Sequence, residues 1–436
     1  MLKDAFEING PNRLEGEITP QGAKNEALQI LCAVLLTPEK VCIHNVPAIR
    51  DVLKLIDVLK AMGVKVKKLE KNAYEFTSDE VKIEALETPL YRELSSSLRG
   101  SVMLLGPLLA RFHKAVLATP GGDKIGRRRL DTHFEGMKML NVDVRFDAAQ
   151  QLYIAETHGL KGTFVHLEEP SVTGTANVVM TAVLADGETT IYNAACEPYV
   201  QQLCKMLVQM GAQINGIGTN RLIIVGVKSL KGTTHTCMPD MIEIGSFIGL
   251  AAMTQSAITI KGALKADLGL IPKVFRGLGI HILEDGDDLK VPRQGIYEAS
   301  TYMDGSILSI SDGPWPLFTP DLISIALVVA TQAKGNVLIH QKMFESRLFF
   351  VDNLIDMGAQ IILCDPHRAT VMGIGRKHYL RGISMRSPDI RAGVSLLIAA
   401  LSAEGKSIIH NIEQIDRGYE QIDQRLNKIG ADIIRH

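Results

Sequence analysis

The same helix ending recurs six times along the chain, at intervals of 68 to 79 residues. Each copy has an amphipathic helical segment, then a residue that tolerates the left-handed conformation, then a β-rich stretch such as residues 359–363. The six anchor residues are Gly63, Asn141, Gly211, Gly279, Gly358 and Gly430. A repeat that accounts for the whole chain predicts six copies of one structural unit of about 70 residues.

Each unit also contains a second helical segment, which is apolar nearly all round. Residues 27–36 and 322–330 are examples, and such helices are buried on every side. Several are followed by a turn and a β-branched strand, as at residues 336–340. The unit is too long for the common solenoids, and six units are too few for a β-helix. We therefore expect an α/β protein of two three-unit domains that face each other, with the binding site in the cleft.

Composition restricts the class of protein. A chain of 436 residues with 46% hydrophobic content suggests two domains of about 200 residues. The net charge of -1 favours neither a nucleic acid nor an anionic membrane as partner. The six cysteines form no CxxC pair and indicate a reducing compartment, and His235 with Cys237 is too small a set for a metal site. Without a leader pattern or a long apolar run, we expect a cytoplasmic protein with no membrane insertion.

Cations stand at the starts of several buried helices, at Lys24, Arg99 and Arg391. A helix N-terminus already carries partial positive charge, so a cation there is favourable only if a bound anion completes the site. Other helix starts have residues that are either simple N-caps or site residues, and these are Ser171, Asp321 and Asp389. Neither a Walker A motif nor a complete GxGxxG occurs. The pattern predicts a multiply charged anionic ligand, bound without the common nucleotide motifs.

The segment 120–133 combines three glycines with four cations. Glycine supplies hinge freedom and arginine binds phosphate or carboxylate in a bidentate way, which predicts a mobile loop over an anionic substrate. The alternative is a solvated basic loop or a nucleic-acid patch, although no interleaved aromatic residues support the latter.

Several longer motifs make the chain resemble the bacterial UDP-N-acetylglucosamine enolpyruvyl transferases from end to end. They are the basic loop and the segments 22–25, 105–112, 239–245, 344–347 and 415–420. The resemblance implies an inside-out α/β barrel fold of two domains and six βαβαββ units. One domain would be residues 23–238, with the mobile loop, and the other residues 1–22 plus 239–436.

The resemblance also implies the reaction. The enolpyruvyl group of phosphoenolpyruvate would move to the 3'-hydroxyl of UDP-N-acetylglucosamine through a tetrahedral ketal, with release of phosphate and without a cofactor or metal. This is the first committed step of peptidoglycan precursor synthesis, which supports cell-wall biogenesis, cell shape and division.

Site residues follow from the resemblance, motif by motif. Phosphoenolpyruvate contacts fall on Lys24, Asn25, Arg128, Arg391 and Arg417. Sugar-nucleotide contacts fall on Asn25, Arg99, Ser171, Val172, Gly174, Asp321 and Arg347. Catalytic roles fall on Asp123, Asp321, Lys24 and Arg417. Four cations would neutralise the phosphate and carboxylate, Asp321 would accept the hydroxyl proton or orient the hydroxyl, and a general acid would protonate C3.

Two positions depart from the family pattern. Most members have Cys where this chain has Asp123 in the loop, and that Cys is the thiol that fosfomycin alkylates. Loop closure beside phosphate raises the pKa of such a carboxyl group, whereas Lys124 and its neighbouring arginines lower it. Our hypothesis is that Asp123 is the loop acid and that the enzyme is insensitive to fosfomycin. The second departure is Ala195, where the family usually has Arg before Glu-Pro.

Two other functions compete with this interpretation. The sister enzyme that acts on shikimate 3-phosphate normally opens with a Lys-Ser pair, whereas this chain has Lys24 and Asn25. A non-catalytic relative that binds a sugar nucleotide would be expected to lose one of the four cations assigned to phosphoenolpyruvate, and all four are present.

Overall fold

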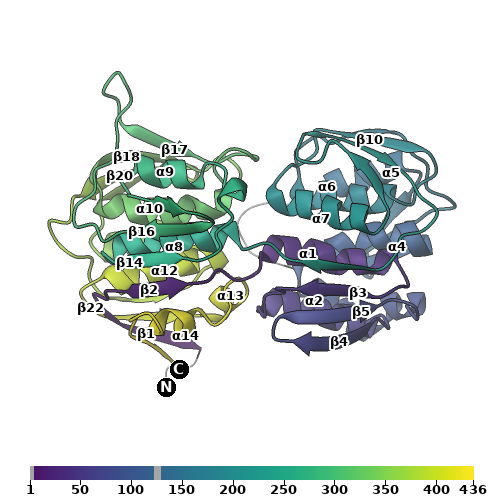
Figure 1. The fold of residues 1–436 in the computed structure, drawn as a ribbon, viewed down its shortest axis with the longest axis horizontal. Helices are drawn as coiled ribbons and strands as arrows, with labels where there is room; N and C mark the ends of the chain where they lie inside the picture. Colours follow the sequence, from purple (N-terminus) through teal and green to yellow (C-terminus); the bar gives the residue numbers. More distant parts are fainter. Residues whose placement is uncertain (1–3, 122–128) are drawn as a thin grey trace. The chain divides into compact units, whose positions relative to one another are not determined.

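The computed structural model describes residues 4–121 and 129–436. These residues separate into two compact units (Figure 1). The inserted unit consists of residues 22–121 and 129–238, and the terminal unit of residues 4–21 and 239–436. Among these residues, no helix combines the length and apolar character that crossing a bilayer requires.

Three helices form the centre of the terminal unit. They are α8 (Met241–Met253), α10 (Ile323–Gln332) and α12 (Ile390–Ser402), and each packs against the other two. Every residue of these helices is buried, which confirms the burial predicted for residues 322–330. Because the helices have no polar face, their sequences are compatible only with a position inside the unit.

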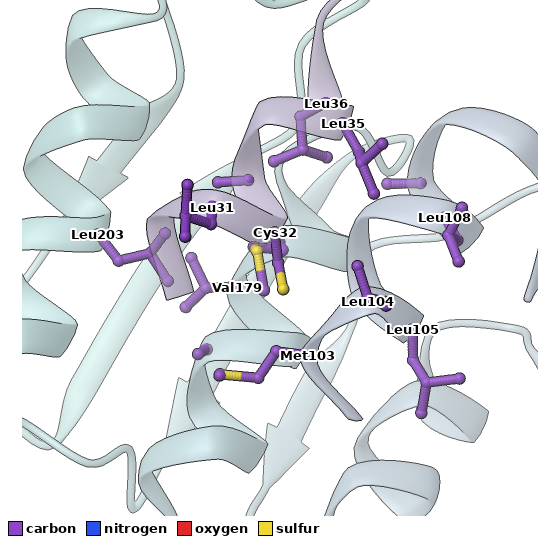
Figure 2. Close-up of a cluster of buried hydrophobic side chains, with 14 of the residues drawn as sticks. Leu31, Cys32, Leu35, Leu36, Met103, Leu104, Leu105, Leu108, Val179 and Leu203 are labelled. Atoms are coloured by element: carbon purple, nitrogen blue, oxygen red, sulfur yellow. The ribbon is translucent and has the colours of Figure 1, made fainter. Parts of the chain in front are cut away.

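The inserted unit has an equivalent centre. It contains α1 (Lys24–Ala33), η3 (Arg99–Leu104), α4 (Leu105–Phe112) and α6 (Val172–Ala182). Figure 2 shows part of this core, where Cys32 lies among Leu31, Met103 and Leu104. Burial raises the pKa of the Cys32 thiol, so this cysteine is an inert core residue.

Six sheets are formed by the described residues, and five share one pattern of pairing. In each of the five, a parallel pair at one edge is followed by two antiparallel pairings. In the inserted unit the sheets are β13 (Thr233–Thr236), β3 (Val41–His44), β5 (Ala73–Thr77) and β4 (Lys65–Glu70); β9 (Phe164–His166), β10 (Glu188–Tyr192), β12 (Arg221–Val225) and β11 (Gln213–Asn215); and the three-stranded β6 (Lys114–Ala118), β8 (Leu152–Glu156) and β7 (Asp143–Asp147). With helices at the centre of each unit and sheets packed against them, the arrangement is the expected inside-out α/β class.

The sheets of the terminal unit include the first two strands of the chain. β1 (Ala5–Gly10) lies between β22 (Gly405–His410) and β23 (Ile433–Arg435), and β2 (Glu15–Ile18) pairs in parallel with β14 (Ala257–Ile260). The remaining strands are β15 (Leu283–Asp285), β16 (Asp288–Val291), β17 (Leu308–Ser311), β18 (Lys334–His340), β19 (Ile361–Asp365), β20 (Arg368–Ile374) and β21 (Ser384–Arg386).

Amphipathic helices precede the six predicted anchors. They are α2 (Arg50–Ala61), α5 (Asp131–Met139), α7 (Pro198–Gln209), α9 (Ile271–Gly277), α11 (Val351–Asp356) and α14 (Ile422–Asn427). All six anchors have positive φ, from 68° at Asn141 to 108° at Gly430, which confirms the predicted left-handed conformation. The remaining helices are η1 (Val34–Leu36), η2 (Ile83–Glu87), α3 (Pro89–Ser96), η4 (Lys265–Asp267), η5 (Pro320–Leu322) and α13 (Glu413–Asp416).

Candidate functional site

A carboxylate held between two guanidinium groups is the central feature of the terminal unit. Asp321 lies in η5, directly before α10, and Arg391 is the second residue of α12. Arg347 Nη2 donates to Asp321 Oδ1 at 2.7 Å, and Arg391 Nη2 donates to Asp321 Oδ2 at 3.0 Å. The structure thus brings together three of the residues that the sequence analysis assigned to ligands.

Asp321 is an anion in this arrangement. Burial opposes its ionisation, but the charges of Arg391 and Arg347 outweigh burial and hold its pKa well below the ordinary carboxyl value. A carboxylate with so low a pKa is a weak base for as long as both guanidinium groups remain in place.

Two of the three candidate N-caps cap a helix, and the third does not. Ser171 Oγ accepts from Gly174 N at 3.2 Å, and Asp389 Oδ1 accepts from Arg391 N at 2.8 Å, so these two residues are caps. The same interpretation is wrong for Asp321, because Thr319 Oγ1 accepts from the backbone N of Asp321 at 3.4 Å. The carboxylate of Asp321 is therefore bonded to Arg347 and Arg391 instead of to a helix N-terminus.

Arg391 is also supported from its other side. Its Nη1 lies 3.4 Å from Tyr419 Oη, and its guanidinium carbon is 5.7 Å from the centre of the Tyr419 ring. The Ser246 hydroxyl donates to Ile242 O, so Tyr419 donates to Ser246 Oγ at 2.9 Å and accepts from Arg391. Burial raises the pKa of Tyr419 to about 12, which keeps the phenol neutral.

Arg417 directly follows α13, and its Nη1 donates to Gln414 Oε1 at 2.8 Å. The neighbouring backbone is tied to the N-terminal segment, because Gln21 Nε2 donates to Gly418 O at 2.8 Å and Gln21 Oε1 accepts from Glu420 N at 2.6 Å. These bonds fix the turn that carries Arg417.

In the inserted unit, the predicted residues also lie at helix starts. Lys24 is the first residue of α1, and its Nζ donates to Asp51 Oδ2 at 2.7 Å, with both side chains almost fully buried. Asn25 follows it. Arg99 is the first residue of η3, and its Nη2 donates to Arg129 O at 3.4 Å.

Ser171 caps α6, and Val172 and Gly174 lie in its first turn, which a polar network holds through Thr173. Asn177 Oδ1 accepts from Gly106 N at 2.9 Å, so the Asn177 amide donates to His133 Nδ1 at 2.8 Å. The other nitrogen, His133 Nε2, then donates to Thr173 Oγ1 at 3.1 Å. Sequence reasoning missed this network and also Asp51, because no local pattern relates residues so far apart in the chain.

Two of the predicted site residues, Asp123 and Arg128, lie outside the described residues. Ala195, the second departure from the family pattern, is buried, and its backbone N donates to Thr175 Oγ1 at 2.8 Å. His235 Nε2 contacts Glu26 Oε1 at 2.7 Å, and within residues 4–121 and 129–436 no group of three or more His, Cys, Asp or Glu could hold a metal ion.

Comparison with known proteins identifies the family. The family model described as EPSP synthase (3-phosphoshikimate 1-carboxyvinyltransferase) matches residues 8–426. Proteins named UDP-N-acetylglucosamine 1-carboxyvinyltransferase are similar over nearly the whole chain. The one from Bacteroides fragilis is 61% identical, with 99% of each chain covered, and the one from Treponema denticola is 47% identical, with 98% covered.

Solved structures show the same fold. The enolpyruvyl transferase NikO from Streptomyces tendae has a TM-score of 0.87 at 20% identity, over 99% of this chain and 98% of that one. EPSP synthase from Acinetobacter baumannii has a TM-score of 0.72 at 17% identity, over 99% of each chain. The chain therefore belongs to the EPSP synthase family of enolpyruvyl transferases, among members named UDP-N-acetylglucosamine 1-carboxyvinyltransferase.

Proposed function

We propose that this enzyme transfers the enolpyruvyl group of phosphoenolpyruvate to the 3'-hydroxyl of UDP-N-acetylglucosamine and releases phosphate. The observation that carries the proposal is the Asp321 carboxylate between Arg347 and Arg391, in a chain 61% identical to enzymes named for this transfer. The reaction needs a base or orienting group for a hydroxyl, together with cations for a phosphate and a carboxylate.

The proposed ligand sets are those that the family resemblance implies. Phosphoenolpyruvate would be bound by Lys24, Asn25, Arg128, Arg391 and Arg417. The sugar nucleotide would be bound by Asn25, Arg99, Ser171, Val172, Gly174, Asp321 and Arg347. We propose that the functional domains are residues 23–238 and residues 1–22 plus 239–436.

In the proposed mechanism, the sugar oxygen attacks C2 of phosphoenolpyruvate while C3 gains a proton, which yields a tetrahedral ketal. The group that protonated C3 then takes a proton from the resulting methyl group, which re-forms the double bond as phosphate leaves with the electron pair of its C–O bond. Cations beside C2 stabilise the charge that moves onto the phosphate.

The pairing of Asp321 implies an order of events within this mechanism. A ligand anion that binds Arg391 removes one of the two guanidinium groups from Asp321. The pKa of Asp321 then rises towards its ordinary value, since one of the opposing charges has been withdrawn. Asp321 becomes a better acceptor for the 3'-hydroxyl proton only when phosphoenolpyruvate is bound.

Asp123 is proposed as the acid that protonates C3. Since it replaces the thiol that fosfomycin alkylates, we expect activity to survive preincubation with the drug. Time-dependent inactivation, with a mass increase on a peptide that contains Asp123, would refute this part of the proposal.

The function is tested by phosphate release from phosphoenolpyruvate, with UDP-N-acetylglucosamine or with shikimate 3-phosphate as acceptor. We expect release with the sugar nucleotide alone, and its loss in Asp123→Ala but not in the control Asp304→Ala, an exposed turn residue. Release with shikimate 3-phosphate would favour the sister activity, and release with neither would favour a non-catalytic binder.

A further inference from the structure

Asp312 is a buried carboxylate outside the proposed ligand sets. It directly follows β17 and is only 1% exposed. Its Oδ2 accepts from Gln341 Nε2 and from Met343 N, the latter at 3.3 Å, and its Oδ1 accepts from Lys342 N. One side chain thus binds three consecutive residues of the segment that follows β18.

That segment leads directly to Arg347. The Phe344 ring lies 4.8 Å from the Arg347 guanidinium carbon, and Arg347 Nη2 is 2.7 Å from Asp321 Oδ1. Two contacts therefore orient the guanidinium group, while Asp312 anchors the start of the segment that carries it.

The backbone of Asp312 leads to the other partner of this ion pair. Asp312 forms a parallel bridge with Phe318, and Gly313 N donates to Phe318 O at 3.1 Å, so residues 312–318 form a closed loop. Thr319 then caps η5, where Asp321 lies. Asp312 is therefore bonded to two segments. One leads to Asp321, and the other leads to Arg347.

Burial of a carboxylate is costly unless the surrounding donors compensate for it. Burial raises the pKa of Asp312, and the backbone N–H groups of Lys342 and Met343 oppose that rise. An apolar residue at this position would leave those N–H groups without their acceptor, because segment 341–343 has left the β18 ladder, which ends at His340. The carboxylate therefore replaces a strand as the hydrogen-bonding partner of this segment.

We propose that Asp312 is a positioning residue that holds Arg347 in register with Asp321, and thereby sets the affinity of the site for the sugar nucleotide. This inference rests on the proposed function. Asp312 acts through Arg347 and does not itself touch substrate.

The test begins with Asp312→Asn, which keeps the shape but places an amide group against N–H donors. A misplacement of about 1 Å can cost on the order of 100-fold, so we expect kcat/KM for UDP-N-acetylglucosamine to fall roughly 10- to 100-fold, mainly through KM. The matched control is Asp304→Asn, whose exposed carboxylate accepts from Ser306 N at 3.0 Å in a turn. We expect the control to stay within about twofold of the wild type.

A double-mutant cycle separates positioning from general destabilisation. In an Arg347→Ala background, Asp312→Asn should leave kcat/KM within about twofold, although thermal unfolding still registers the substitution. The same proportional loss in both backgrounds would overturn the inference. If Asp312→Asn does not fold, Gln341→Met removes one of the three donors and is expected to show a smaller loss that also vanishes without Arg347; a loss that persists would overturn the inference.

Assays of the wild-type protein distinguish a failure of the proposed function from a failure of the role inferred for Asp312. No transfer to UDP-N-acetylglucosamine by the wild type would overturn the proposed function and this inference with it. Wild-type activity combined with independent effects of Asp312 and Arg347 would overturn the inference alone.

Discussion

Replacing Arg425 by methionine should destabilise the terminal unit strongly. Glu243 in α8 is completely buried, and its carboxylate accepts from Arg425 Nη1 at 2.6 Å, Arg425 Nη2 at 3.0 Å and Gln21 N at 2.7 Å. The substitution leaves a buried carboxylate with only the Gln21 donor among these three. Breaking a buried ion pair by removing one partner costs about 3–5 kcal/mol, because the remaining charge is uncompensated.

The loss should depend on pH in a defined direction. Burial raises the pKa of Glu243 above its ordinary value, while Arg425 lowers it, so removal of Arg425 raises the pKa further. A carboxyl group with a raised pKa in the folded state contributes its full stability below the unfolded pKa, and this contribution is lost as pH rises through the folded pKa. The deficit of Arg425→Met relative to the wild type should therefore grow from roughly pH 5 to pH 8.

Thermal unfolding measures both effects. For a unit of about 200 residues, 1 kcal/mol shifts Tm by about 2–4 °C, so the variant should melt roughly 6–20 °C lower at pH 8. The matched control is Lys334→Met, which breaks the exposed pair with Glu298 and should cost at most about 1 kcal/mol. Equal Tm values for the two variants at pH 8, or a deficit that does not change with pH, would refute the reasoning.

Three further substitutions test the proposed base, a helix cap in the proposed site, and the packing around Trp315. Asp321→Asn cannot accept a proton, so kcat for phosphate release should fall by at least about 100-fold, and an unchanged kcat would exclude Asp321 as the base. Ser171→Ala removes the acceptor of Gly174 N and should cost about 1 kcal/mol while weakening sugar-nucleotide binding in titration calorimetry; unchanged binding would remove Ser171 from the site. Gly269→Ala places a Cβ atom 2.4 Å from Trp315 Cη2 at a φ of +52°, so the emission of this single tryptophan should shift, and an identical spectrum would contradict the packing described.

Local patterns predicted the central helices and the left-handed anchors. Residues 322–330 have no polar face, and Gly358 follows an amphipathic helix directly, so each prediction depended on neighbouring residues. The positions of Lys24, Arg99 and Arg391 at helix starts could also be predicted, because the apolar runs that follow them predict the helices.

The partners of these residues were not predictable in the same way. Asp321 is 26 residues from Arg347 and 70 from Arg391, and the donors to Asp312 lie 29 to 31 residues along the chain. No periodicity connects such positions, since their contacts arise only when whole helices and sheets pack together. Asp321 therefore carried two interpretations in the sequence, as a cap and as a site residue, and only its ion pairs with arginine distinguish them.

The pairing of β1 has a consequence for synthesis on the ribosome. β1 is made long before its neighbours β22 and β23, with Ala5 opposite His410. All strands of the inserted unit have been made by residue 236, so this unit can fold while β1 and β2 still wait for their sheets. β2 can pair once β14 has been made, whereas β1 has no partner strand until β22 has been made, so β1 needs protection for much longer.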